Sequence, residues 1–215
     1  MKSIPEDGIV EPPPPPLRII ENQSIERKTF KDTQYNYDVL NCVFSSCSFT
    51  GVIFRGIIRS TFEKCQFDKC VFYHDLKNVT FKQCKHVESN FTKITLNDTS
   101  FIKTALLQTT ALFSIFDNCR FEDGEYSSPE TKQTKFLNCC FERYNILPGT
   151  EIHNATMTSC KLQNFSIRDV HLYSTSFKSC IFTIINCANS TFSTCEFPYS
   201  SFVRCSYTDN KFIRC

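Results

Sequence analysis

Residues 60–72 read STFEKCQFDKCVF, and within this stretch Phe62, Phe67 and Phe72 recur at intervals of five residues. A period of five matches neither the turn of an α-helix nor the two-residue alternation of a flat strand. It does match a chain that turns a corner after every five residues and stacks its coils, because each large apolar residue then reaches the same interior. The same step can be followed, with a few interruptions, over residues 44–212.

A second, small residue stands two positions before most of the large ones. Cys65 precedes Phe67 in this way, and Thr175 precedes Phe177. The other three positions of each repeat are mostly polar or charged. One large and one small inward residue in every five indicate a narrow, four-sided interior with coils of about twenty residues. Adjacent coils are expected to pair as parallel strands about 4.8 Å apart, which allows roughly eight coils between residues 44 and 212.

The domain organisation follows from where this step holds. Residues 1–27 contain the run Pro12–Pro16 and are expected to form a Pro-rich, disordered leader. The solenoid is expected over residues 28–215. Loop interruptions are expected where the five-residue step slips or where Gly and Pro signal a turn, near residues 55–61, 123–131 and 147–151.

Composition and motifs exclude several functions. The net charge is +2, without the strongly basic balance of a nucleic-acid-binding protein, so no nucleic acid partner is expected. No P-loop, nucleophile elbow or HExxH motif occurs, so we expect no catalytic residues, no cofactor and no enzyme activity. The histidines and Cys84 do not complete a four-ligand set, so no metal is expected.

Membrane contact is expected only through a parent protein. No stretch approaches eighteen consecutive apolar residues, the length that a membrane-spanning helix needs. The first twenty residues also lack the apolar segment of a signal peptide.

Seven Asn-x-Ser/Thr sequons are present, more than the composition predicts, and this excess favours N-glycosylation in a secreted or luminal protein. The alternative is that the repeat itself concentrates Asn and Ser/Thr on outward positions. The candidate acceptors are Asn22, Asn78, Asn90, Asn97, Asn154, Asn164 and Asn189.

Most of the fourteen cysteines occupy the small inward position, where a thiol acts as a compact apolar group. Three pairs are twenty residues apart and would lie on one side of adjacent coils, within the Cα separation of a disulfide. In a luminal protein these pairs are the candidate disulfides: Cys119/Cys139, Cys160/Cys180 and Cys195/Cys215. The cysteines alone do not decide the compartment.

The order of small residue, polar residue, Phe or Leu and two variable residues resembles the pentapeptide-repeat family over about residues 30–215. This resemblance implies an all-β fold, a right-handed quadrilateral parallel β-helix. Within that family, Phe-rich and Cys-containing repeats such as residues 60–67 and the sequon at 189–192 are most similar to the luminal domains of the synaptic vesicle glycoprotein 2 family. That likeness implies a glycosylated luminal or extracellular domain of a transporter-like membrane protein, which serves as a receptor surface for bacterial neurotoxins. The Pro-rich leader and the absence of flanking spans depart from it.

Three functions stay open from the sequence. The first is a non-enzymatic luminal module that binds a protein partner through a solenoid face or its open β-edge, formed by Phe192, Phe197, Phe202, Tyr207 and Phe212. The second is a soluble cytoplasmic pentapeptide-repeat protein with a structural or topoisomerase-interacting role. Relatives that mimic DNA and protect gyrase need a strongly negative rod, and a net charge of +2 argues against that mimicry. The third is a purely structural spacer.

Overall fold

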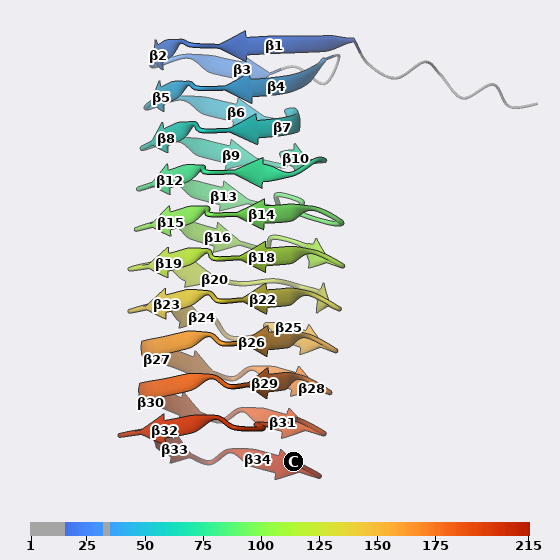
Figure 1. Cartoon of the computed structure of the whole chain (residues 1–215), viewed down its shortest axis with the longest axis vertical. Coiled ribbons are helices and arrows are strands. Elements are labelled where there is room, and N and C mark those ends of the chain that lie inside the picture. The colour runs from blue at the N-terminus through green and yellow to red at the C-terminus, as the bar shows by residue number, and fades with distance from the viewer. Residues whose placement is uncertain (1–15, 32–34) are drawn as a thin grey trace, which may run out of the picture.

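The computed structural model describes residues 16–31 and 35–215, which form a single parallel β-solenoid with each coil stacked on the one before it (Figure 1). The predicted all-β, four-sided parallel β-helix is confirmed, since each coil places four large residues inward and every strand pairing is parallel. Ten coils can be followed along one side through its inward residues: Ile25, Phe44, Phe62, Phe81, Phe101, Phe121, Phe141, Leu162, Phe182 and Phe202.

The strands form three sheets that run along the solenoid (Figure 1). The first contains β1 (Leu17–Glu21), β4 (Asn36–Leu40), β7 (Ile53–Ile58), β10 (Val71–Phe72), β11 (Leu76–Lys77), β14 (Thr95–Asn97), β18 (Ile115–Asp117), β22 (Lys135–Leu137), β26 (Thr156–Thr158) and β29 (Ser176–Lys178). The last contains β17 (Ala111–Leu112), β21 (Thr131–Lys132), β25 (Glu151–His153), β28 (His171–Tyr173), β31 (Thr191–Ser193) and β34 (Lys211–Ile213).

The remaining sheet covers the second and third sides of the coil. Its second-side strands are β2 (Ser24–Glu26), β5 (Val43–Ser45), β8 (Thr61–Glu63), β12 (Thr80–Lys82), β15 (Ser100–Ile102), β19 (Arg120–Glu122), β23 (Cys140–Glu142) and β32 (Ser201–Val203). Its third-side strands are β3 (Thr29–Lys31), β6 (Ser48–Thr50), β9 (Gln66–Asp68), β13 (Lys85–Val87), β16 (Ala105–Leu107), β20 (Glu125–Tyr126), β24 (Asn145–Ile146) and β33 (Ser206–Thr208). Two longer strands, β27 (Lys161–Arg168) and β30 (Ile181–Ala188), run through both sides.

The core consists of rings stacked along the axis. On the second side the ring centroids of Phe44 and Phe62 are 4.9 Å apart with planes 3° apart, and Phe81 and Phe101 are 5.2 Å apart. These distances equal the spacing of paired strands, so the backbone register places the rings face to face. The same register makes the Phe residues the main source of buried apolar area in the first six coils.

Each corner combines a left-handed residue with a small inward one. Thirty-three non-glycine residues of the described chain have a φ near +50°, and they stand at the corners between sides. Asn and Asp adopt this conformation most readily among non-glycine residues. The inward residue that follows donates a hydrogen bond to two carbonyls, as Thr104 Oγ1 does to Phe81 O at 3.0 Å and to Ile102 O at 3.1 Å. This position therefore favours a small donor, Ser, Thr or Cys, although Val79, Ile94 and Tyr144 occupy it at other corners and are also buried.

The start of the solenoid differs from the predicted boundary at residue 27. Strands β1 and β2 already belong to the first coil, because Ile20 and Ile25 continue the five-residue step and Ile25 is buried. The predicted disorder of the leader concerns the run Pro12–Pro16, most of which lies outside the described residues.

At two of the three places where a loop interruption was expected, the strand pairing between coils continues. Near residues 55–61, strand β7 continues through a bulge, and Ile57 fills the interior. Near residues 123–131, Thr131 pairs with Ala111 exactly one regular coil earlier, and the chain stays on its path. Gly124 follows the corner residue Asp123 and leaves room for the ring of Tyr144 in the next coil, since a Cβ there would lie 2.4 Å from that ring.

The third interruption, near residues 147–151, is a turn with one additional residue. Thr131 pairs with Ile152, twenty-one residues later, whereas neighbouring coils advance by twenty. Gly149 has a φ of +78° at this turn, a conformation that favours glycine. The extra residue is therefore accommodated at the corner and does not disturb the sides.

His86 replaces Phe in the aromatic stack on the third side. Its ring lies 4.3 Å from that of Phe67 with planes 2° apart, and it meets Phe81 edge to face. Neither ring nitrogen has a hydrogen-bond partner in the described structure. Complete burial lowers the pKa of His86 from 6.5 to about 3, so the imidazole is neutral in the folded protein.

We expect His86→Phe to raise the free energy of unfolding at neutral pH by about 1–3 kcal/mol, because it removes two unsatisfied buried nitrogens. Between pH 6.5 and about 3, His86 of the unfolded wild type binds a proton, whereas His86 of the folded protein stays neutral. The free energy of unfolding of the wild type therefore falls as the pH falls through this range. The His86→Phe variant has no imidazole at this position, so its free energy of unfolding does not fall for this reason. Urea unfolding at several pH values should show a gap between the two proteins that widens toward acid, and a gap independent of pH would contradict this account.

Candidate functional site

The described chain ends in a coil whose interior side chains are uncovered. Phe202, Tyr207 and Phe212 stand at inward positions of this coil, yet they are 45%, 44% and 49% exposed. The matching residue of the first coil, Ile25, is only 7% exposed. Of the other residues expected at this edge, Phe192 is buried beneath the Phe212 ring at 4.8 Å, and Phe197 is half-buried. The exposed edge therefore consists of the last three residues of the predicted five.

Backbone groups at this end are also available for pairing. In earlier coils the corner amide donates to a carbonyl of the following coil, as Asp123 N does to Glu142 O at 3.0 Å and Asn189 N to Thr208 O at 3.0 Å. In the last described coil the equivalent corner residues are Arg204, Asp209 and Arg214. Within the described residues no further coil faces their amides. An extended segment laid against this end would satisfy them, as in β-strand addition.

An apolar patch on the second side adjoins the end surface. Ile181, Ile184 and Val203 point outward and are 45%, 43% and 48% exposed. Ile184 has a φ of +55°, a conformation that is strained for a β-branched residue. Other corners of this row carry polar residues such as Lys64 and Arg143. The sequence analysis did not identify this patch, although apolar residues at outward repeat positions could have indicated it.

The sequon asparagines fall into two groups. Asn22, Asn78, Asn154, Asn164 and Asn189 are exposed corner residues with positive φ, and Asn90 and Asn97 are half-buried on the sides. Asn is favoured at positive φ, and the Ser or Thr two residues later starts the next strand. The repeat geometry thus accounts for five of the seven sequons without glycosylation, which stays a prediction.

All fourteen cysteines are free thiols, including the three pairs considered as disulfides. Their inward Sγ atoms lie against backbone carbonyls: Cys139 Sγ is 3.3 Å from both Phe116 O and Leu137 O. Cys180 Sγ makes the same two contacts at 3.4 and 3.5 Å. Burial raises the pKa of the Cys70 thiol to about 12, which suppresses the reactive thiolate. The cysteines therefore act like the Ser and Thr residues at equivalent corners.

The described residues were also compared with what a metal site, a membrane-spanning helix and a charged binding surface require. Among the described residues, no group of His, Cys, Asp and Glu side chains is arranged to hold a metal ion. No helix in that part of the chain is long and apolar enough to cross a membrane. Charges on the sides pair locally, as where Arg143 bridges Glu122 at 2.8 Å and Asp123 at 2.5 Å. Such mixed pairs leave no single-sign surface along this part of the rod.

No known family profile and no curated protein matches the chain. Among solved structures, it is similar to HetL, a pentapeptide repeat protein involved in heterocyst differentiation regulation in the cyanobacterium Nostoc sp. strain PCC 7120. That comparison has a TM-score of 0.54 at 9% identity and covers 87% of this chain and 86% of HetL. A trypsin-treated form of QnrB1, a plasmid-mediated fluoroquinolone resistance protein, gives a TM-score of 0.53 at 10% identity, covering 88% of this chain and 91% of QnrB1.

These likenesses and the register of the coils show the fold: a parallel β-helix like those of HetL and QnrB1. They support the assignment of the repeat made from its residue pattern. They lend no support to the likeness with synaptic vesicle glycoproteins.

Thiol labelling of the native protein should modify Cys140, Cys205 and Cys215 rapidly, because these three are at least partly exposed. The other eleven thiols are buried and should react only after unfolding. Mass spectrometry of protein labelled without reductant is expected to count fourteen modified cysteines after unfolding. A total of twelve or fewer would show that disulfides exist.

Ile184→Asn is expected to stabilise the fold by about 1 kcal/mol, since Asn adopts the left-handed corner conformation with little strain. Thermal unfolding measures the change. Asn164→Ile, at the preceding corner of the same row, is the matched control and should destabilise by a similar amount. If Ile184→Asn instead destabilises, Ile184 contributes packing that outweighs its backbone strain.

Proposed function

We propose that the protein is a non-enzymatic protein-interaction module that binds an extended segment of a partner at the C-terminal end of the solenoid. The observation that carries this proposal is the coincidence of two features at one place. Phe202, Tyr207 and Phe212 expose apolar surface, and the adjacent corner amides lack a following coil. Strand addition uses such a combination, because main-chain hydrogen bonds give affinity and apolar contacts add to it.

The second side is the preferred edge for the partner strand. A strand added below β32 would lie beside Val203, and its side chains could extend over Ile181 and Ile184. Retained backbone strain at an exposed residue is a sign of a functional site. The patch thus gives the partner an apolar contact on the flank as well as at the end.

Two observations favour the cytoplasmic setting over the luminal one. The thiols are free and donate to carbonyls at the corners, which suits a reducing compartment. The corner geometry also supplies an explanation for most of the sequons that had favoured a luminal setting. We therefore propose a soluble cytoplasmic pentapeptide-repeat protein. The solved structures that resemble this chain give no support to a vesicle-glycoprotein role or to a neurotoxin partner.

The partner captured from an extract of the source cells should be purified and its affinity measured by calorimetry against variants of the end surface. Tyr207→Lys is expected to weaken binding at least tenfold, because it places a charge in the centre of the apolar contact. Tyr73→Lys is the matched control: Tyr73 is 65% exposed near the other end of the rod, and this variant should bind like the wild type.

Hydrogen exchange supplies the second readout for this proposal. Partner binding should protect amides of β32, β33 and β34, since strand addition pairs them. Equal affinity of the Tyr207→Lys and Tyr73→Lys variants, together with unchanged exchange in the last coil, would place the binding site elsewhere on the rod.

A further inference from the structure

A cavity of about 360 Å³ lies inside the last coils of the solenoid. Its lining begins at Ile146 and ends at Cys215, and it includes Ile167, Cys187 and Tyr207 from the third side. These third-side residues belong to successive coils, so the cavity spans four coils, or about 14 Å along the axis. It is therefore long and narrow, and in the 215-residue chain the uncovered last coil forms its mouth.

The inward residues explain why the cavity forms here. In the earlier coils stacked rings such as Phe49 and Phe67 fill the interior of the third side. In the last coils smaller residues take their place, and Cys187 lies where Phe67 lies six coils before. At the same time Phe165 and Ile185 occupy the small corner position and are buried. The corners at Asn164 and Ile184 keep a left-handed φ although the strands β27 and β30 run through them, so the cavity follows from the smaller third-side residues.

We propose that this cavity binds the hydrocarbon chain of a fatty acid. Its lining is apolar apart from the thiols of Cys187 and Cys215 and the Tyr207 hydroxyl. A polar ligand would lose its hydration there without gaining partners, whereas a hydrocarbon gains contact with Leu, Ile and Phe side chains. A single unbranched chain also matches an interior that follows the axis through four coils.

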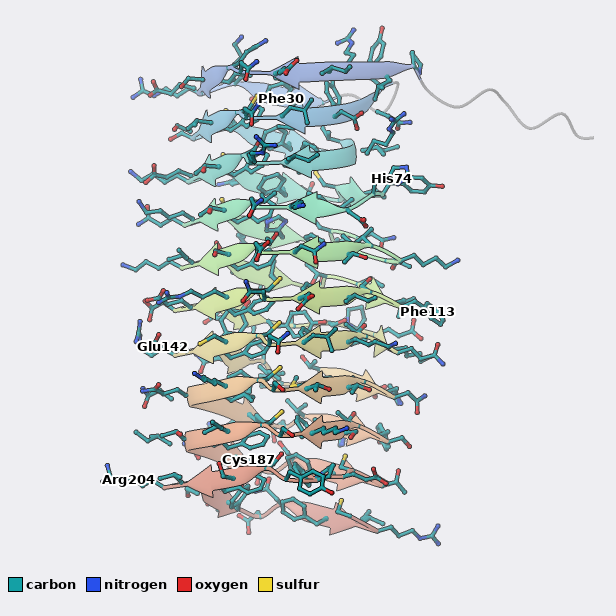
Figure 2. The ribbon with its side chains drawn as sticks, viewed as in Figure 1. Phe30, His74, Phe113, Glu142, Cys187 and Arg204 are labelled. Carbon is teal, nitrogen blue, oxygen red and sulfur yellow. The ribbon has the colours of Figure 1, made fainter. Side chains whose placement is uncertain are left out.

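The residues around the mouth suit a carboxylate. Lys211 and Arg214 stand before and after Phe212 on the fourth side and are exposed. Arg204 is a corner residue of the same coil (Figure 2). Asp209 occupies the corner before the fourth side. A carboxylate that leaves the mouth beside Phe212 would meet the two cations of the fourth side. The site takes a ligand of the free protein and does not depend on the proposed protein partner.

The test is calorimetric titration of the 215-residue protein with dodecanoate, decanoate and octanoate below their micellar concentrations. One molecule should bind, and each loss of two carbons should weaken binding roughly 15-fold, because each buried methylene contributes about a fourfold factor. Dodecyltrimethylammonium should bind more weakly than dodecanoate, and Lys211→Gln with Arg214→Gln should reduce that preference. Binding without any dependence on chain length would contradict the proposal.

A variant that fills the cavity tests the fatty-acid site while it leaves Phe202 and Phe212 of the end surface in place. Cys187→Phe places a ring where other coils carry one, so it should raise the melting temperature and weaken dodecanoate binding at least tenfold. Ile181→Phe is the matched control, because Ile181 is on the same strand but points outward, and it should bind like the wild type.

Two results would overturn the inference. One is equal binding of dodecanoate by the wild type and Cys187→Phe. The other is an end-to-end dimer in analytical ultracentrifugation that covers the mouth and persists with excess dodecanoate. The first result leaves the protein-interaction proposal standing, since Cys187→Phe leaves Phe202 and Phe212 in place and its partner affinity can be measured separately. The dimer would cover the end surface as well, so it would count against both proposals.

Discussion

The structure depends on a hydrogen-bonding unit at each corner, where an inward Ser, Thr or Cys donates to two backbone carbonyls. One carbonyl lies two residues earlier and the other lies in the preceding coil, as the contacts of Thr104 and Cys139 show. The first contact shapes the corner, and the second ties the corner to its neighbour. Because a buried carbonyl without a partner is costly, this small donor does more than fill space. Ser, Thr and Cys therefore share this position, and at the corners with Val79, Ile94 or Val170 the inward side chain fills the space without making the hydrogen bonds.

The exceptions to this rule account for the functional candidates. Where Phe165 and Ile185 replace the small donor, the corners at Asn164 and Ile184 keep their left-handed φ but lose the side-chain hydrogen bond to the carbonyls. Where Ile184 replaces a polar corner residue, apolar surface appears on the outside. Both changes fall in the last coils, next to the uncovered end. The regular coils supply a rigid rod, and the irregular ones supply a place where other molecules can bind.

The fold could be predicted from the sequence because period and residue size encode it directly. The spacing of Phe62, Phe67 and Phe72, with Cys65 and Cys70 two positions before the last two, defines an inward pattern that admits one packing. Corner details could not be predicted. The step near residues 123–131 reads as a loop from Gly and Pro, yet Thr131 pairs with Ala111 twenty residues earlier. The sequons favoured a luminal protein, and five of their seven asparagines occupy left-handed corners, a backbone conformation that the sequence does not display. The paired cysteines were disulfide candidates only for a luminal protein. The end surface was partly predicted, but Phe192 was misplaced since its cover, Phe212, belongs to the next coil.

The length of one coil also governs how the chain reaches this structure. Each strand pairs with a segment only about twenty residues away, so the contacts are short in sequence and the loops to be closed are small. Folding can therefore start within two neighbouring coils and propagate along the axis. The coils around the cavity have the least filled interior, so fewer apolar contacts hold them together. The proposed binding region is therefore also the part of the described solenoid that opens most easily under thermal or mechanical load.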